Sequence, residues 1–234
     1  MKIGIYVAHD DDSILGVGGR ILQYLKDGNE VYVVIFTDGR NSHKAVLGVE
    51  RNPTVLEVKT KRKEEIKKAM DVLGVERRKI YFLNLTDGEG KIWQNKKRAH
   101  KQALKITKRE RPDILYFHHP DAHRDHKAVA EIVPKILKEL KYKPEAYQFF
   151  IWTKELAKNR PEVSAKDVPQ IPKNAIKVDI RDELTNKRKA LYKMKSQISK
   201  QPYKNWSIQK IPILNKDFIN YFLRGEEVFI KVKY

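Results

Sequence analysis

The sequence predicts an α/β fold, in which a Rossmann-like, mostly parallel sheet is covered by helices on both faces within a single domain. Short apolar runs alternate with segments of helical periodicity, which is the pattern of repeated strand–helix units. The runs at 2–8 and 30–37 are apolar almost throughout, as expected of parallel strands buried on both faces. A chain of 234 residues, 41% of them hydrophobic, can bury one sizeable core.

The predicted elements follow one another along the chain. We expect strands at residues 2–8, 30–37, 79–83, 114–117, 146–152, 176–180 and 228–232. We expect helices at residues 14–26, 58–73, 95–109, 125–140 and 182–197. Residues 40–54 and 155–174 lack periodicity, so we expect both to be loops. Residues 155–234 should therefore form a loop-rich C-terminal part that packs on the core, within one domain of residues 1–234.

Composition narrows the class of protein. The chain has no cysteine, which excludes both a disulfide framework and a thiolate zinc finger. No run of eighteen apolar residues occurs, and the first apolar run is too short for an export signal. We therefore expect a cytoplasmic protein without a membrane span. The lack of cysteine, with abundant lysine, glutamate and isoleucine, resembles the composition of heat-adapted, thermophilic proteins.

The chain is strongly basic, with a formal net charge of +19 and a pI near 9.8. Such a surface suits nucleic acids or other anionic partners. Most lysines and arginines are nevertheless scattered along helix-like segments beside acidic residues, and the densest stretch, 187–210, has few aromatic residues and no glycine-rich loop. We therefore favour a solvated basic surface, with a nucleic-acid-binding protein that has a vestigial metal site as the rival hypothesis.

A cluster of acidic residues follows the first predicted strand. Ligands of such sheets bind beyond the carboxyl ends of the strands, and His9 is followed there by Asp10, Asp11 and Asp12. Adjacent carboxylates repel one another, so a divalent cation is the simplest counter-charge. A helix N-cap would explain only one of the three acids. The glycine-rich segment 16–19 comes too late for a dinucleotide-binding loop, and the acids would repel a pyrophosphate.

Histidines cluster after the fourth predicted strand. Four of the seven histidines fall within residues 118–126, which is too dense for incidental surface histidines. We expect His43, His100 and at least one of the pair His118 and His119 to be structural or solvated.

The two loops should meet at one edge of the sheet and form a metal centre. His9 and His126, with the carboxylate of Asp12, make a set of two imidazoles and one carboxylate. This set suits zinc with an open position for water, although another divalent metal such as iron is compatible with it. Zinc would lower the pKa of its bound water from ~15.7 to ~7.

Three further residues of these loops are candidate catalytic groups. Asp11, which is not a ligand in this set, can accept the proton of the attacking water. His123 can donate a hydrogen bond to the oxyanion at the attacked carbonyl, and we expect Asp125 to orient its ring.

Several motifs occur in a fixed order along the chain. The two longest are Ala8-His9-Asp10-Asp11-Asp12 and Pro120-Asp121-Ala122-His123-Arg124-Asp125-His126. Shorter ones are Thr37-Asp38-Gly39, Arg62, Glu65, Ala69, Leu73-Gly74, Asp87-Gly88, Lys187, Ala190-Leu191 and Ser196-Gln197. This pattern resembles the LmbE-like (PIG-L) family of N-acetylglucosamine deacetylases over most of the chain.

The resemblance implies roles for individual residues. It implies that His9, Asp12 and His126 bind zinc. It also implies that Asp11 is the general base and that His123 assists the oxyanion or the leaving amine.

One position departs from the family pattern, because the family's proline is Asp10 here. Proline stiffens a loop and lacks an N–H group, so the geometry of this loop is less constrained without it. We expect the added charge of Asp10 to pair with a basic neighbour such as Arg40. We also expect Asp38, Arg40 and Arg62 to contact the sugar or an anionic substituent of it.

The implied reaction removes the N-acetyl group from an N-acetylglucosamine-type sugar, oligosaccharide or glycoconjugate. Hydrolysis of another amide at the same metal centre is the alternative. A structural zinc is closed by four protein ligands, and three good ligands here count against the nucleic-acid rival. We therefore expect a small-molecule or oligosaccharide partner, and the proline-rich, partly apolar C-terminal third could bury against a second subunit in a homo-oligomer.

Overall fold

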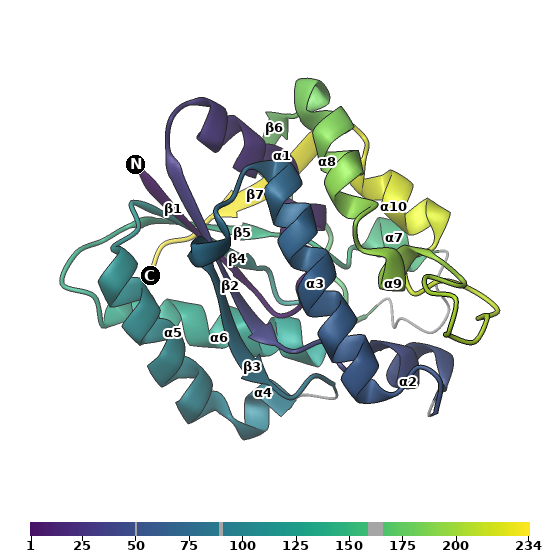
Figure 1. The fold of residues 1–234 in the computed structure, drawn as a ribbon. Helices are drawn as coiled ribbons and strands as arrows, with labels where there is room; N and C mark the ends of the chain where they lie inside the picture. Colours follow the sequence, from purple (N-terminus) through teal and green to yellow (C-terminus); the bar gives the residue numbers. More distant parts are fainter. Residues whose placement is uncertain (50, 89–90, 159–165) are drawn as a thin grey trace.

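One sheet of seven strands organises the described residues of this computed structural model, which are 1–49, 51–88, 91–158 and 166–234 (Figure 1). The strands are β1 (Lys2–Val7), β2 (Glu30–Thr37), β3 (Ile80–Leu85), β4 (Ile114–His118), β5 (Glu145–Phe149), β6 (Ile176–Asp179) and β7 (Glu226–Lys231). Their order across the sheet is β3-β2-β1-β4-β5-β7-β6. Strands β1 to β5 are parallel, and β7 runs antiparallel to both of its neighbours. The predicted mostly parallel sheet is therefore confirmed.

Helices cover both faces of the sheet, as predicted (Figure 1). Helices α1 (Asp12–Lys26), α3 (Val55–Leu73), α8 (Leu184–Leu191) and α10 (Lys216–Phe222) share one apolar core with the sheet. Helices α4 (Lys91–Gln94), α5 (Lys96–Glu110) and α6 (Arg124–Lys138) share the core on the other face. The remaining α-helices of the described residues are α2 (Ser42–Leu47), α7 (Lys154–Ala157) and α9 (Lys195–Ile198). Strands β1 and β2 lie between the two cores, which explains why their sequences are apolar almost throughout.

The order of the strands determines where a ligand can bind. Strand β1 pairs in parallel with both β2 and β4, so successive strands build outward from β1 in two directions. In the register of β1 and β4, Tyr6 lies opposite Phe117, close to the carboxyl end of each strand. The loops after β1 and β4 therefore emerge side by side, at the point where ligands of such sheets bind.

The glycines near the start of α1 allow close packing. A Cβ atom at Gly16 would collide with the ring of Phe149, and one at Gly19 would collide with Ile180. Both glycines lie inside α1 and not in the loop before it. The glycines at these two positions are thus explained by the close packing of α1 against Phe149 and Ile180.

A buried ion pair joins α8, β7 and the middle of α1. The Nζ atom of Lys187 lies 2.8 Å from Glu227 Oε1 and donates a hydrogen bond of 2.8 Å to the carbonyl of Leu15. The Glu227 carboxylate also accepts hydrogen bonds from the backbone N–H groups of Gly19 and Arg20, at 2.7 and 2.9 Å. Each buried charge thus has a counter-charge, and both side chains also form hydrogen bonds with backbone groups of α1.

Replacing Lys187 with methionine is expected to lower the free energy of unfolding by about 3 kcal/mol or more. The substitution leaves Glu227 buried without its counter-charge, and breaking such a pair is strongly destabilising. Urea unfolding of Lys187→Met, beside the exposed control Lys189→Met, measures the effect. Equal stability of the two variants would contradict this account.

The predicted loops contain short helices. Residues 40–54 include α2, and residues 155–174 overlap α7, whose N-cap Thr153 accepts a hydrogen bond from the Leu156 N–H group. These elements are too short to give a periodic apolar pattern. Residues 50 and 159–165 of the two predicted loops lie outside the described residues.

The C-terminal part also differs in detail from the prediction. The helix predicted at 182–197 is divided into a 3-10 turn (Arg181–Glu183), α8 and α9. The division follows α8, where Leu191 and Met194 both turn into the core. Helix α10 was not predicted, although Asn215 caps it by accepting a hydrogen bond of 2.9 Å from the Phe218 N–H group.

Among the described helices, none combines the length and the apolar character that crossing a membrane requires.

Candidate metal centre

Three loops at the carboxyl edge of the sheet converge on one buried cluster. The loop after β1 contributes His9, Asp11 and Asp12, and the segment after β3 contributes Asp87. The loop after β4, with the first turn of α6, contributes histidines and acids of the second motif. Within the described residues, three overlapping groups of side chains could hold a metal ion. They are His9, His123 and His126; Asp12, His118 and His126; and His9, Asp87 and Asp125.

The structure brings the three predicted ligands together. Asp12 Oδ2 lies 3.2 Å from His9 Nδ1 and 3.4 Å from His126 Nε2. Two ligand atoms that each lie about 2.0–2.1 Å from a tetrahedral zinc are about 3.4 Å apart, so each of these two separations is compatible with a metal between its two atoms. The predicted trio is not itself one of the three groups found among the described residues, each of which contains one or two of its members. His126 Nε2 is also buried without a hydrogen-bond partner among the described residues. A buried nitrogen lone pair of this kind is what a metal ligand needs.

Each of the two histidines predicted as ligands has a carboxylate at its other ring nitrogen. His126 Nδ1 lies 2.8 Å from Asp121 Oδ2, and His9 Nε2 lies 3.3 Å from Asp87 Oδ1. Such partners fix the tautomer and leave the first nitrogen free for a metal. Asp121 and Asp87 were not predicted as residues of the site, although both stand in the motifs quoted above. A histidine that binds a metal usually has a hydrogen-bond partner at its other ring nitrogen, and a search for such partners could have identified both aspartates.

Two further histidines lie at the end of β4, just before the second motif. His118 Nε2 accepts a hydrogen bond of 3.0 Å from the Ala8 N–H group and lies 3.3 Å from Asp12 Oδ2, and its Nδ1 atom is buried without a hydrogen-bond partner among the described residues. The ring of His119 stacks on Phe150, and its Nδ1 atom lies 2.9 Å from the Pro120 carbonyl oxygen. The ring of His119 is thus engaged away from the cluster, whereas His118 belongs to one of the groups that could hold a metal, so the expectation for this pair stays a prediction.

The pKa values of the adjacent carboxyl groups of Asp11 and Asp12 are shifted in opposite directions. Burial raises the pKa of Asp11 to about 6, against the nearby charge of Arg62. Burial also acts on Asp12, but His126 and His118 outweigh it and hold the pKa of Asp12 well below its usual value. Two carboxyl groups with pKa values pushed apart suit an acid–base group and a permanently charged group, respectively.

His123 is a neutral hydrogen-bond donor in this arrangement. Its Nδ1 atom accepts a hydrogen bond of 3.2 Å from the Asp125 N–H group, so the ring proton belongs on Nε2. Burial and the neighbouring His9 and His126 lower the pKa of His123 to about 3.

The ring of His123 is thus held by the backbone of Asp125, whereas an orienting carboxylate was expected. The Asp125 carboxylate instead lies 3.7 Å from His9 Nε2.

The predicted substrate-contacting residues form ion pairs of their own. Arg62 is 3% exposed and forms ion pairs with Asp10 and Asp11. The prediction that Asp10 pairs with Arg40 is therefore wrong, because its partner is Arg62. Arg40 pairs with Asp38, and it keeps 27% of its side chain exposed. Arg40 is therefore the most accessible of the three residues predicted to contact substrate.

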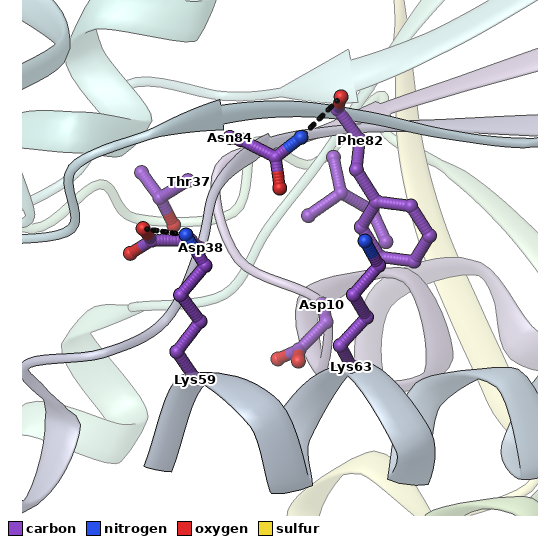
Figure 2. Close-up of a pocket in the computed structure, with 8 residues that line it drawn as sticks. Asp10, Thr37, Asp38, Lys59, Lys63, Phe82 and Asn84 are labelled. Carbon is purple, nitrogen blue, oxygen red and sulfur yellow. Dashed lines mark hydrogen bonds and ion pairs between the residues drawn. The ribbon is translucent and has the colours of Figure 1, made fainter. Parts of the chain in front are cut away.

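A small pocket separates Asp10 from the ends of β2 and β3 (Figure 2). Lys59 reaches from α3 toward Asp38, with its Nζ atom 3.2 Å from Asp38 Oδ2. Lys63, also on α3, lies over the ring of Phe82. The pocket volume of about 10 Å³ is room for roughly one water molecule. It is therefore too small to be a sugar site.

His43 lies outside the metal centre. Its shifted pKa is expected to make the stability of the protein depend on pH. His43 is 1% exposed, and its ring meets the edge of Trp206. Burial, with the charge of Arg62, lowers the pKa of His43 to about 4. Between pH 6.5 and 4 the unfolded chain therefore binds a proton that the folded chain does not. The contribution to stability is complete above pH 6.5, and up to about 3 kcal/mol is lost as the pH falls to 4.

Urea unfolding at pH 7.5 and pH 4.5 measures this loss. The difference in free energy of unfolding between the two pH values should be smaller in His43→Leu than in the wild type. An identical difference in both proteins would contradict the assignment of the pH dependence to His43.

The fold and the His/Asp cluster define a Rossmann-like α/β protein with a candidate metal centre at the switch point of its sheet. Residues 5–137 match the PIG-L family, described as GlcNAc-PI de-N-acetylase. Because this match covers more than half of the chain, the protein belongs to the PIG-L family. The resemblance drawn from the sequence motifs is thereby confirmed.

Individual relatives support the same assignment of family and fold. The chain is 28% identical over 123 residues to diacetylchitobiose deacetylase of Thermococcus kodakarensis, which is 51% of this chain and 42% of that protein. The structure of N,N'-diacetylchitobiose deacetylase from Pyrococcus horikoshii matches with a TM-score of 0.66 and 22% identity, over 99% of this chain and 83% of that one.

The same fold also occurs in a protein with a different printed activity. The 4-carboxy-2-hydroxymuconate hydratase GalB from Pseudomonas putida matches with a TM-score of 0.72 and 17% identity, over 100% of this chain and 97% of that one. The fold alone therefore does not determine the reaction.

Proposed function

We propose that this protein is a metal-dependent hydrolase that removes the N-acetyl group from an N-acetylglucosamine-type sugar, oligosaccharide or glycoconjugate. The observation that carries the proposal is the position of Asp12 Oδ2, within 3.4 Å of a nitrogen on His9 and on His126. Membership of the PIG-L family and the deacetylase relatives add support for the choice of substrate.

His9, Asp12 and His126 would hold the metal, which we expect to be zinc because two imidazoles and one carboxylate leave an open position. When bound, the metal would polarise the amide carbonyl and lower the pKa of a water molecule at the site. Asp121 and Asp87 would keep the ligand rings in place through their second nitrogens.

Asp11 would accept the proton from water. Its Oδ1 atom is held by Arg62 Nη2 at 3.1 Å, and within the described residues no hydrogen bond reaches Oδ2. Oδ2 can therefore take the proton and later deliver it to the departing nitrogen. A raised pKa suits this exchange, because a group that both accepts and returns a proton works best near the operating pH.

His123 would stabilise the negative charge that develops on the carbonyl oxygen. A neutral ring with its proton on Nε2 can donate one hydrogen bond to that oxygen. Donors of this type typically contribute on the order of 10² to 10³ in rate. Arg40, the most exposed of the predicted contacts, would bind the sugar or an anionic substituent.

An acetate-release screen tests the proposed reaction. The panel should contain N-acetylglucosamine, its short oligomers, and glycoside and lipid conjugates of the sugar. An N-acetylated amino acid tests the alternative of another amide, and 4-carboxy-2-hydroxymuconate tests hydration. Zinc-loaded protein is expected to release acetate from at least one N-acetylated sugar, whereas turnover of either comparison substrate alone would contradict the proposal.

A further inference from the structure

Asp10 follows His9 in the loop after β1, and its carboxylate is held from two sides. Oδ1 accepts a hydrogen bond of 2.9 Å from the Asp11 N–H group and one of 3.0 Å from Arg62 Nε. Arg62 Nη2 also contacts Oδ1. The Asp10 carbonyl accepts a further hydrogen bond of 2.7 Å from Ser13 Oγ. The loop is thus held by hydrogen bonds of a buried aspartate.

Arg62 is enclosed by its partners. Its Nη1 atom donates to Gln197 Oε1 at 3.2 Å, and its Nη2 atom donates to Asp11 Oδ1 at 3.1 Å. The backbone of Gly39 lies so close that a Cβ atom there would stand 2.6 Å from Arg62 Nε. The guanidinium therefore contacts Asp10, Asp11, Gln197 and Gly39, and a substrate could reach it only by displacing one of them.

We propose that Asp10 is a positioning residue, which anchors Arg62 so that the guanidinium holds only one oxygen of Asp11. This inference rests on the proposed role of Asp11 as proton acceptor. An arginine prefers to bind a carboxylate through two parallel hydrogen bonds. With Asp10 in place, Arg62 donates hydrogen bonds to Asp10 from both Nε and Nη2, and it contacts Asp11 through Nη2 alone. Asp11 Oδ2 is thereby left to accept the proton.

The loss of the Asp10 charge should redirect Arg62 onto Asp11. Asp10→Asn keeps an oxygen that can accept from the Asp11 N–H group, but it removes the counter-charge of the guanidinium. Arg62 is then expected to bind both oxygens of Asp11. Removing Arg62 as well should release Asp11, so the Asp10→Asn/Arg62→Gln double variant should be more active than Asp10→Asn alone.

Steady-state kinetics of acetate release tests the proposal on the substrate found in the screen. We expect Asp10→Asn to lower kcat by about tenfold to a hundredfold, with KM within about twofold and metal content unchanged. The exposed pair Asp71 and Arg77 supplies the matched controls Asp71→Asn and Arg77→Gln, which should keep the wild-type kcat. A raised KM at unchanged kcat in Asp10→Asn would overturn the proposal, because it would make Arg62 a substrate contact.

A measurement without substrate separates this proposal from the proposed function. The ¹³C carboxyl resonance of Asp11, observed at one pH in the zinc-loaded protein, should shift in Asp10→Asn and move back in the double variant. An Asp11 resonance that is unchanged in Asp10→Asn would overturn the positioning role, whether or not the wild type releases acetate. Failure of the wild type in the screen, with the expected shift present, would contradict the proposed function alone.

Discussion

Replacing Asp11 with asparagine is expected to reduce acetate release by about 10²- to 10⁴-fold while the protein keeps its metal. Asparagine fills the same volume but cannot take a proton at Oδ2, the oxygen that Arg62 leaves free. The three predicted ligands are untouched, so metal binding should persist. Kinetics and metal analysis of the same preparation measure both quantities.

The exposed variant Asp71→Asn is the control for this experiment, because it makes the same chemical change away from the site. Full activity of Asp11→Asn would remove Asp11 as the proton acceptor. Loss of the metal together with the activity would instead make Asp11 a ligand.

The second large effect is expected at His126, whose replacement by alanine should abolish both metal binding and activity. The substitution removes the buried Nε2 atom that has no hydrogen-bond partner among the described residues. Wild-type protein should contain about one zinc per chain, and His126→Ala should lose most of it. His100→Ala is the matched control, because His100 pairs with Glu139 at 2.9 Å outside the metal centre.

The variant Asp121→Asn is expected to have an intermediate effect on metal binding. The carboxylate of Asp121 holds His126 Nδ1, and partners of this kind typically account for a 10- to 100-fold change in metal affinity. We therefore expect weaker zinc binding in Asp121→Asn than in the wild type, and stronger binding than in His126→Ala. Unchanged metal content in His126→Ala would refute the assignment of this ligand.

The sequence predicted the fold and the meeting of two loops because these follow from simple regularities. Continuous apolar runs marked β1 and β2, and the rule for parallel sheets placed the loops after β1 and β4 at one edge. The juxtaposition of His9, Asp12 and His126 could therefore be expected from chain order alone.

Other features depend on three-dimensional contacts that no local pattern reveals. The partner of Asp10 is Arg62, which is 52 residues away on α3. Arg40 was the nearer basic residue in the sequence, but it is held by Asp38. The environment of His118 likewise depends on Ala8, which follows β1 and donates a hydrogen bond to the Nε2 atom of His118.

Short elements escaped prediction for a similar reason. Helices α2, α7 and α10 are each seven residues or fewer, so their apolar positions do not repeat often enough to show a period. Their capping residues were the available signal, and Thr153 and Asn215 both cap in the structure.

The most direct test of the account is a zinc titration of metal-free protein, with acetate release from an N-acetylated sugar as the readout. Metal-free protein should show no activity, and the activity should rise linearly with added zinc and saturate near one zinc per chain. His126→Ala should show no such increase over the same range. Acetate release that is independent of metal, or no release from any N-acetylated sugar by fully loaded protein, would contradict the account.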